Sequence, residues 1–344
     1  MWMIYGAYGY TGDLIAREAV RRGHKPIVAG RDAARTEALA RELGLPSRVF
    51  DLSQPDLSGI SLVVHCAGPF LHTSKIMVNA CLAAGVHYLD ITGEIAVFES
   101  VFKRDEEAKK RGILLLPGVG FDVVPTDCLA AALHERMPDA TELWLAFASF
   151  GGGISRGTLK TMLEGAGWGG AIRENGRIRR VPQVFDARQI PFPSGPRWTM
   201  TIPWGDVSTA YRTTGIPNIR VYSAYPRSTI RQLRLFRGLM PILRLRPIQR
   251  LAQKYADRRR GPDETQRATS RVELWGRVRN AKGEEATMTH TMGEGYDFTA
   301  RSAVQAVEHV LASPTPGAMT PTMALGRTFC RAVGAGAGAG AGAD

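Results

Sequence analysis

The first third of the chain alternates short apolar runs with segments in which apolar residues recur every three or four positions. Short apolar runs predict buried strands, and the three-to-four spacing predicts helices that pack on them. We expect strands at residues 3–5, 26–29, 47–50, 62–65, 88–91 and 113–116, and helices at 13–22, 33–43 and 97–111. Because strand and helix alternate, the pattern predicts the α/β class with a Rossmann-type doubly wound parallel sheet.

A second pattern begins near residue 141, where apolar and polar residues alternate and glycine and proline interrupt the runs. This alternation predicts the strands of an antiparallel or mixed sheet over 141–209. Strand-like alternation returns within 264–298, and Phe298–Leu311 has the spacing of a helix. These residues predict an α+β substrate domain that is inserted after the Rossmann domain.

The changes of pattern set the expected domain boundaries. We place the Rossmann domain at 1–130, the substrate domain at 131–300, and C-terminal helices that return to the Rossmann domain at 301–333. Residues 334–344 repeat glycine and alanine, and we expect a disordered tail there because these side chains cannot build a core.

The composition is that of a folded protein, since 44% of the 344 residues are hydrophobic and 22% are charged. The first residues enter a glycine motif without the features of a signal peptide, and no apolar run reaches the ~18 residues of a membrane span. The four cysteines have no Cys-x-x-Cys spacing, so we expect reduced thiols and no metal site. Together these features predict a soluble cytoplasmic protein.

The strongest local motif is the glycine-rich segment that follows the first predicted strand and precedes the first predicted helix. Glycines there let the backbone approach a diphosphate, and the N–H groups of the helix N-terminus point at the anion. The spacing Gly-x-x-Gly-x-x-Gly is weak alone, but its strand–turn–helix context favours a dinucleotide site. The predicted cofactor-binding residues of this turn are Gly6, Tyr8, Gly9, Tyr10, Thr11 and Gly12.

The residues after the second predicted strand indicate which dinucleotide binds. NAD enzymes usually carry an acidic residue there, whereas this chain has Gly30 followed by Arg31. The Arg31 guanidinium suits the 2'-phosphate of NADP, and Gly30 removes a carboxylate that would repel it. We therefore predict NADP, with Asp51 as a further binding residue. The alternative is that Arg31 is a solvated loop residue and Asp32 holds NAD.

Further blocks of sequence resemble the saccharopine dehydrogenase-like NADP-binding family, particularly its branch of trans-acting enoyl reductases. The resemblance rests on Gly6–Gly12, Gly30-Arg31, Cys66–Phe70, Ala80-Cys81, Gly85–Glu94, Gly120–Asp127, Thr320-Pro321 and Gly326. It implies a Rossmann domain, an inserted substrate domain and C-terminal helices that return to the first domain. It leaves the substrate open, because the family's reactions range from secondary-amine dehydrogenation to reduction of C=C bonds. Longer members often carry Gly-Glu-Pro where this chain has Thr73-Ser74-Lys75.

The chemistry is expected beyond the carboxyl ends of the strands, where doubly wound sheets bind ligands. Ala67, Gly68 and Pro69 follow the strand at 62–65 and are predicted to lie along the nicotinamide ribose, although a rigid turn explains them equally well. Hydride transfer leaves a product that needs a proton. The predicted catalytic residues are Tyr88 and His72 as proton donors and Asp122 as a further site residue; a structural role stays open for each.

One segment holds most of the formal charge of +12, because residues 227–260 contain ten arginines and one lysine against a single acid. Apolar residues recur through it at three- and four-residue steps, which predicts two amphipathic helices broken around Pro241–Pro247. Basic amphipathic helices suit an anionic membrane surface. Packing on the protein's own body is the other main interpretation, and nucleic acid is disfavoured because no nucleic-acid motif accompanies the charge.

These observations predict an NADPH-dependent reductase of a C=C, C=N or C=O bond in a hydrophobic, lipid-like substrate. Two alternatives remain: an amino-acid dehydrogenase of the saccharopine type, with Arg156, Lys160 and Arg173 as candidates to bind substrate carboxylates, and a non-catalytic dinucleotide-binding module at a membrane. A homodimer and contact with the inner face of the membrane are further expectations.

Overall fold

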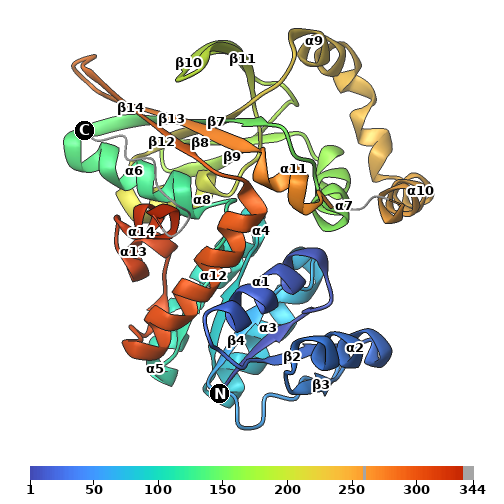
Figure 1. The fold of residues 1–344 in the computed structure, drawn as a ribbon. Coiled ribbons are helices and arrows are strands. Elements are labelled where there is room, and N and C mark those ends of the chain that lie inside the picture. Colours follow the sequence, from blue (N-terminus) through green and yellow to red (C-terminus); the bar gives the residue numbers. More distant parts are fainter. Residues whose placement is uncertain (259–260, 336–344) are drawn as a thin grey trace. The chain divides into compact units, whose positions relative to one another are not determined.

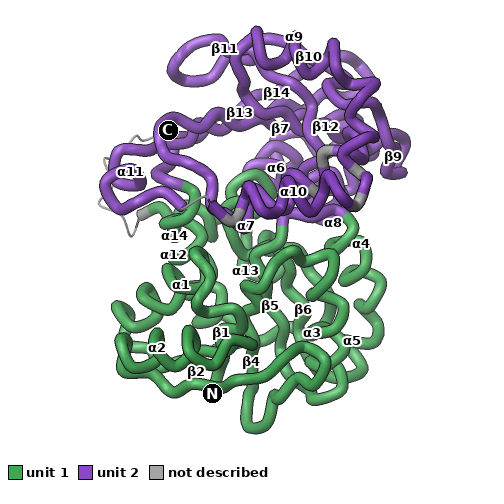
Figure 2. Tube along the Cα trace, turned by 90° about the vertical axis from the view of Figure 1, so that its right-hand side faces the viewer, with its two compact units in different colours: residues 1–92, 96–128, 295–344 green, residues 93–95, 129–294 purple. Residues whose placement is uncertain are grey.

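The computed structural model describes residues 1–258 and 261–335, shown in Figure 1. The chain divides into two compact units, coloured in Figure 2. Unit 1 comprises residues 1–92, residues 96–128 and the segment that starts at Gly295, and unit 2 comprises residues 93–95 and 129–294.

Unit 1 is built on a seven-stranded sheet in which every pair of neighbouring strands is parallel. Its strands are β1 (Trp2–Tyr5), β2 (Ile27–Gly30), β3 (Ser47–Val49), β4 (Leu62–His65), β5 (His87–Asp90), β6 (Leu114–Leu116) and β15 (Gly317–Ala318). The order β3-β2-β1-β4-β5-β6-β15 reverses direction between β1 and β4. This is the topology of a Rossmann fold and confirms the predicted fold class.

Helices flank this sheet: those expected at 13–22 and 33–43 are present, whereas the helix at residues 70–84 was not predicted. The helices are α1 (Tyr10–Arg21), α2 (Ala33–Leu43), α3 (Phe70–Ala84), α4 (Ile95–Phe102), α5 (Asp105–Arg111), α12 (Gly295–Ala312), α13 (Pro321–Leu325) and α14 (Phe329–Ala335). The residues of β1 and β4 are all buried, as near-continuous apolar strands require when both faces of a sheet are covered. α12 packs along α1, so the C-terminal segment completes unit 1.

The single helix expected at 97–111 is wrong, because the chain forms two helices there, α4 and α5, with a break at 103–104. The acidic run Asp105-Glu106-Glu107 opens α5 and Lys109-Lys110-Arg111 closes it, which matches the dipole of a separate short helix. The Asp105 carboxylate also accepts a hydrogen bond of 2.7 Å from the N–H of Ala318 in β15. The charges at the two ends of α5 and the contact of Asp105 with β15 therefore both favour a separate helix that begins at Asp105.

The predicted disordered tail, 334–344, falls largely outside the described residues. Its first two residues, Gly334 and Ala335, belong to α14. Residues 336–344 are not described.

Unit 2 contains an eight-stranded mixed sheet and several helices. The strands are β7 (Ala140–Phe150), β8 (Gly170–Glu174), β9 (Arg177–Val181), β10 (Ala187–Phe192), β11 (Gly195–Thr201), β12 (Asn218–Ala224), β13 (Arg271–Asn280) and β14 (Glu285–Met292). The helices are α6 (Val124–Arg136), which starts in unit 1, α7 (Arg156–Ala166), α8 (Asp206–Thr214) and α11 (Glu264–Ala268). Only β12 and β7 pair in parallel among the described strands of this sheet.

The expectation of strands throughout 141–209 is wrong at two places, because α7 and the start of α8 lie within that range. The Ser155 side chain caps α7 by accepting a hydrogen bond of 3.2 Å from the N–H of Thr158. A serine cap is a local helix signal that does not depend on the alternation of apolar and polar residues from which the strands were predicted.

One face of the second sheet packs on α6 and has no room for a side chain at its centre. A Cβ at Gly276 of β13 would lie 2.6 Å from Leu133 Cδ1 and 3.1 Å from Leu129 Cδ2 of α6. Both leucines are buried. Glycine at this point lets the helix approach the sheet closely.

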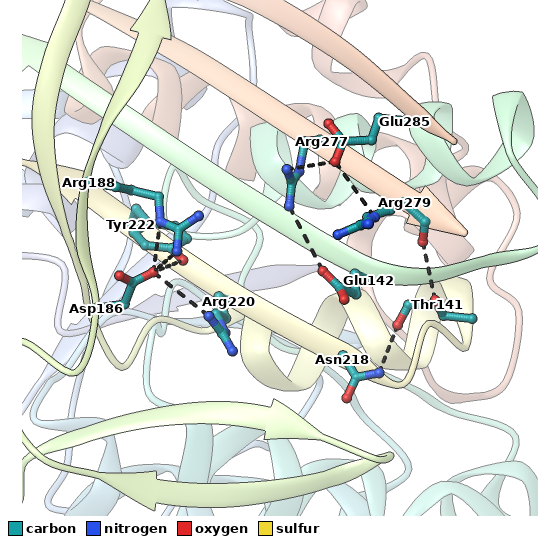
Figure 3. A network of polar contacts seen from close by, with 10 residues as sticks. All are labelled: Thr141, Glu142, Asp186, Arg188, Asn218, Arg220, Tyr222, Arg277, Arg279 and Glu285. Atoms are coloured by element: carbon teal, nitrogen blue, oxygen red, sulfur yellow. Dashed lines mark hydrogen bonds and ion pairs between the residues drawn. The ribbon is translucent and has the colours of Figure 1, made fainter. Parts of the chain in front are cut away.

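The other face carries arginines around an aromatic side chain. The strand register places Trp144 of β7 between Arg220 of β12 and Arg277 of β13. The Arg277 guanidinium lies 3.5 Å and the Arg188 guanidinium 3.9 Å from the centroid of the Trp144 ring. Figure 3 shows how carboxylates compensate these charges. Asp186 accepts hydrogen bonds from Arg188 Nε (2.8 Å) and from the Tyr222 hydroxyl (2.7 Å).

The basic segment forms the two predicted helices, α9 (Arg227–Phe236) and α10 (Arg246–Asp257), both amphipathic. Between them lies a 3-10 helix, η1 (Arg237–Arg244), which contains Pro241. The break around the prolines is therefore confirmed. In the described part of the chain, no helix has both the length and the hydrophobicity that crossing a bilayer requires.

We expect Asp186→Asn to lower the free energy of unfolding by about 1–2 kcal/mol, because two arginines and a tyrosine hydroxyl lose a charged acceptor. The matched control is Glu285→Gln, whose carboxylate pairs with Arg277 at 2.9 Å but is more exposed. Because water screens this pair, Glu285→Gln should lower the free energy of unfolding by only about 0–1 kcal/mol. Chemical denaturation measures both values, and equal losses for the two variants would contradict the role given to Asp186.

Candidate functional site

The glycine-rich turn joins β1 to α1 in unit 1, as the sequence predicted. Gly6 has a φ of +82°, a conformation that favours glycine, and its N–H donates to the Ala29 carbonyl oxygen at 2.8 Å. A Cβ at Gly12 would lie 2.4 Å from the Gly6 carbonyl oxygen. The two glycines thus allow the first turn of α1 to pack directly on the end of β1.

A second loop meets this turn at the point where the strand order reverses. The N–H of Cys66 donates to the Tyr5 carbonyl oxygen at 2.8 Å. A Cβ on Gly6 would lie 2.8 Å from the backbone nitrogen of Ala67. The structure therefore brings together two groups of predicted cofactor residues, the Gly6–Gly12 turn and the turn that contains Ala67, Gly68 and Pro69. The carboxyl ends of β1 and β4 form the crevice in which this fold binds dinucleotides.

Buried polar groups hold the second turn in place. The Thr73 hydroxyl donates to the Ala67 carbonyl oxygen at 2.7 Å and lies 3.0 Å from Nε2 of His65. Because that hydroxyl proton is directed at a carbonyl, the His65 ring is the donor to Thr73. Burial lowers the pKa of His65 to about 3, so the ring is neutral. Thr73, where the chain departs from longer family members, therefore supports the turn after β4.

At the other end of the glycine turn, Tyr8 covers the end of β2. A Cβ at Gly30 would lie 2.3 Å from Tyr8 Cε1. The Tyr8 ring in turn lies 4.4 Å below the guanidinium of Arg35, whose Nη2 donates to the Tyr8 carbonyl oxygen at 3.0 Å. Any side chain at position 30, including the acid of an NAD enzyme, would displace Tyr8. Gly30 is therefore required by packing as well as by charge.

Arg35 was not found by the sequence analysis, although it follows Arg31 by four residues at the start of α2. Arg31 itself is exposed. The alternative role for Asp32 is not favoured, because its carboxylate caps α2 by accepting from the N–H of Arg35 at 3.1 Å. Two arginines thus lie at the end of β2, where an adenosine 2'-phosphate would need positive charge.

Asp51 lies in the exposed turn after β3. Hydrogen bonds from Ser53, assisted by the nearby Arg31, lower the pKa of the Asp51 carboxyl. Its carboxylate oxygen accepts from the N–H of Ser53 at 2.9 Å. Its assignment to cofactor binding stays a prediction.

These residues fit an NADP molecule. Glycines 6, 9 and 12 provide a cradle that a Cβ would fill, and Gly9 precedes α1 without a side-chain cap. The N–H groups of the first turn of α1 would hold the diphosphate, and Arg31 and Arg35 would hold the 2'-phosphate. Tyr8, Tyr10 and Thr11 line the same turn, and Tyr10 lies edge-on to Tyr296 of α12. When bound, the nicotinamide would supply or accept a hydride.

The prediction that Tyr88 donates a proton to the substrate is wrong in this geometry. The Tyr88 side chain is 0% exposed, within β5, and its hydroxyl donates to the buried Asp90 carboxylate at 2.6 Å. Burial and the neighbouring Asp90 raise the pKa of Tyr88 well above its ordinary value. Because the Tyr88 phenol is inaccessible to solvent and already hydrogen-bonded to Asp90, its role is to stabilise the core.

Asp90 itself joins two loops at the carboxyl edge of the sheet. Its Oδ1 accepts from the N–H of Thr92 at 3.0 Å and of Gly118 at 2.8 Å. The first bond holds the turn after β5, and the second holds the turn after β6. Burial raises the pKa of Asp90 to about 6, against the opposing effect of these hydrogen bonds. Asp90 is therefore a positioning residue for this edge.

The other two catalytic candidates lie on segments at the carboxyl ends of strands. His72 is exposed in the first turn of α3. Asp122 is half-buried in the turn between β6 and α6. α12 fixes that turn, since the N–H of Phe121 donates to the Thr299 hydroxyl at 3.0 Å. Their catalytic roles stay predictions.

Comparison with known proteins agrees with this geometry. The family model for the saccharopine dehydrogenase NADP binding domain matches residues 2–116, which contain both loops of the crevice. The predicted resemblance is confirmed, and the predicted cofactor, NADP, is the one that the saccharopine dehydrogenase NADP binding domain binds.

Two curated relatives of the family match over part of their length. A Mycobacterium tuberculosis protein named "putative trans-acting enoyl reductase" is 31% identical over an alignment 180 residues long, which covers 47% of this chain and 43% of that protein. A saccharopine dehydrogenase-like oxidoreductase of Homo sapiens is 26% identical over an alignment 219 residues long, which covers 55% of this chain and 50% of that protein. The chain spans about half the length of the curated relatives it matches.

Among solved structures, saccharopine dehydrogenase (L-Glu forming) from Saccharomyces cerevisiae has a similar fold. The TM-score is 0.62 at 12% identity, and the match covers 96% of this chain and 95% of the yeast chain. At this identity the likeness shows the fold alone.

We expect Arg31→Ala to weaken NADPH binding by about 10- to 100-fold, since a charge-assisted hydrogen bond to the 2'-phosphate would be lost. NADH binding should change by less than about 2-fold, because NADH has no such phosphate. Fluorescence titration measures both affinities. Arg41→Ala is the control, because Arg41 is an exposed arginine near the far end of α2, the helix that follows Arg31. Equal effects on both cofactors would contradict the assignment.

Asp90→Asn should reveal the raised pKa of Asp90 in the pH dependence of stability. The folded carboxyl has a pKa of about 6 against 3.8 for an ordinary aspartate. The folded state therefore binds the proton more tightly, and wild type should lose stability relative to the variant as pH rises between these values. The loss should be about 3 kcal/mol.

Denaturation curves of wild type and Asp90→Asn between about pH 4 and pH 7 measure this difference. Asp51→Asn is the control, because the pKa of Asp51 is lowered from its ordinary value of 3.8, so its difference from wild type should stay nearly constant over this pH range. A difference between wild type and Asp90→Asn that is independent of pH would contradict the burial of an ionisable Asp90.

Proposed function

We propose that this protein is an NADPH-dependent oxidoreductase that reduces a C=C, C=N or C=O bond in a hydrophobic, lipid-like substrate. The observation that carries the proposal is the NADP-binding family of residues 2–116, together with a crevice that two close backbone turns form. The 31% identity to a protein named as an enoyl reductase supports a C=C bond as the acceptor. A cytoplasmic location and a homodimer belong to the same proposal.

The proposed reaction balances with one cofactor and one proton. The Gly6–Gly12 turn with Arg31 and Arg35 would hold NADPH, which would supply a hydride to one carbon of the acceptor bond. A proton would join the other atom of that bond, which would leave NADP⁺ and the reduced product. The proton must come from water or from a side chain beside the crevice, for which Asp122 and His72 are the candidates.

The amino-acid dehydrogenase alternative requires cations that bind the carboxylates of its substrate. One of the three candidates, Arg173, is occupied within unit 2: its Nε donates to the Val207 carbonyl oxygen at 2.8 Å and its Nη1 to the Gly176 carbonyl oxygen at 2.7 Å. The residue is only 6% exposed, and its guanidinium stacks on Tyr211. Only Arg156 and Lys160 remain for that alternative.

Apolar side chains around α7 support a hydrophobic substrate. Ile154, Met162 and Trp168 are large and exposed although they lie in or beside one helix of unit 2. Trp144 stacks with arginines and Trp204 packs on Phe147, and the Arg180 guanidinium lies 5.0 Å from the centroid of the Trp168 ring. Exposed apolar groups of this kind mark binding surfaces.

Oxidation of NADPH in the presence of candidate substrates tests the proposal. The panel contains long-chain enoyl thioesters, hydrophobic ketones and imines, and an amino acid paired with a 2-oxo acid. We expect turnover with a hydrophobic acceptor, and transfer of deuterium from deuterated NADPH to the product. Turnover with the amino-acid pair alone would favour the alternative, and binding without any turnover would favour a non-catalytic module.

Within an active preparation, substitutions identify the proton donor. Asp122→Asn or His72→Gln should lower kcat by about 100-fold or more if that side chain supplies the proton. Tyr88→Phe is the control and should change kcat by only a few-fold, because its hydroxyl faces Asp90. A large kcat effect confined to Tyr88→Phe would contradict the structural role assigned to it.

A further inference from the structure

The segment formed by α9, η1 and α10, residues 227–257, exposes an unusual number of large apolar side chains. Leu235, Phe236, Leu239, Leu245, Leu251 and Tyr255 are each between 51% and 77% exposed. Amphipathic helices of globular proteins normally turn such residues toward a core. Here the buried positions include Ile230 and Ala256, which lie near the two ends of the segment. Burial in unit 2 therefore does not explain most of its apolar residues.

Positive charge covers the same surface. Arg231, Arg234 and Arg237 are exposed and share one shallow hollow with Leu235. None of these three arginines forms an ion pair with a carboxylate in residues 1–258 and 261–335. In α10, Leu251 and Tyr255 are four residues apart and lie on one side of the helix, with Arg250 and Lys254 beside them. Apolar and basic residues thus lie side by side on this surface. The ribbons of α9 and α10 are gold in Figure 1.

The basic surface continues at the start of α9. The Arg227 guanidinium lies 4.8 Å from the Trp198 ring, and that of Arg197 lies 4.5 Å from the Phe150 ring. These four residues line a hollow of about 370 Å³. Arginines on aromatic rings beside an open hollow can bind phosphate groups without losing their apolar contacts.

We propose that residues 227–257 dock this protein on an anionic phospholipid membrane. The exposed leucines and aromatic residues enter the interface between headgroups and acyl chains, and the arginines pair with lipid phosphates. The proposal rests on this surface alone and does not depend on the proposed reaction.

Charge and hydrophobicity together select this partner over others. Nucleic acid would satisfy the arginines but would leave the leucines in water. A second copy of the surface would cover the leucines but would place arginines against arginines. A membrane with anionic lipids satisfies both groups at once.

Flotation of the full-length protein with vesicles tests the proposal. One vesicle contains phosphatidylcholine with phosphatidylglycerol, and the other contains phosphatidylcholine alone. We expect strong binding to the anionic vesicles, weak binding to the neutral ones, and weaker binding in high salt.

Two sets of substitutions separate charge from hydrophobicity. Arg231→Gln, Arg234→Gln and Arg237→Gln combined should reduce partitioning on anionic vesicles by on the order of 100-fold. Leu235→Ser, Phe236→Ser and Leu239→Ser combined should abolish the part of the vesicle binding that persists in high salt. The matched controls are Lys110→Gln with Arg111→Gln and Arg136→Gln, and Val20→Ser with Leu311→Ser, all exposed positions outside the segment. The controls should bind as wild type, and NADPH titration with circular dichroism verifies that every variant is folded.

Three outcomes would overturn the proposal. Wild type does not bind anionic vesicles, or the segment variants bind as wild type does, or the protein binds duplex DNA or dimerises through this segment while leaving vesicles unbound. Loss of NADPH turnover with intact vesicle binding would count against the proposed reaction only, so the two proposals fail separately.

Discussion

Backbone meets backbone at the carboxyl ends of β1 and β4, and this contact constrains the rest of unit 1. Gly6 lies so close to Ala67, and Gly12 so close to the Gly6 carbonyl, that neither position has room for a Cβ. The contact sets where α1 begins and where the turn after β4 runs. It also brings Tyr8 over Gly30 and, through Tyr8, positions Arg35. A dinucleotide site therefore follows from the packing of two turns, before any side chain contacts a ligand.

Buried polar groups maintain the same edge of the sheet from inside. His65 and Thr73 hold the turn after β4, and Asp90 holds the turns after β5 and β6. His65 and Asp90 are fully buried, so each must be hydrogen-bonded to be tolerated. Burial shifts the pKa of His65 and of Asp90 in opposite directions, as expected for a base and an acid. Residues beside a crevice that have a shifted pKa can hold its loops in place rather than take part in a reaction, as Tyr88 and Asp90 do here.

Unit 2 uses its charges in two different ways. On the sheet, Asp186, Glu142 and Glu285 compensate the arginines that surround Trp144, so that cluster stabilises the unit. On α9 and η1, Arg231, Arg234 and Arg237 lack such partners in the described chain and lie beside exposed leucines. Exposed leucines on a helix contribute little to folding, because they gain no burial. A partner outside the chain would explain why exposed leucines and arginines lie together on α9 and η1. The cluster around Trp144 requires no such partner, because its charges are compensated within unit 2.

The sequence by itself determined six of the seven strands of unit 1, its helices α1, α2 and α12, the glycine turn and the broken basic helices, but not β15 or α3. These features depend on residue spacing, glycine and proline, which act locally. The tertiary structure decided the rest. It separated α4 from α5 through the contact of Asp105 with β15, placed β12 parallel to β7, buried Tyr88 on Asp90, and added Arg35 to the predicted site. The first, second and fourth of these outcomes need a contact between residues far apart in the chain or a register between strands. Tyr88 and Asp90 are only two residues apart, but their burial depends on β4 and β6, which pair with β5. The local pattern of polar and apolar residues does not encode such contacts.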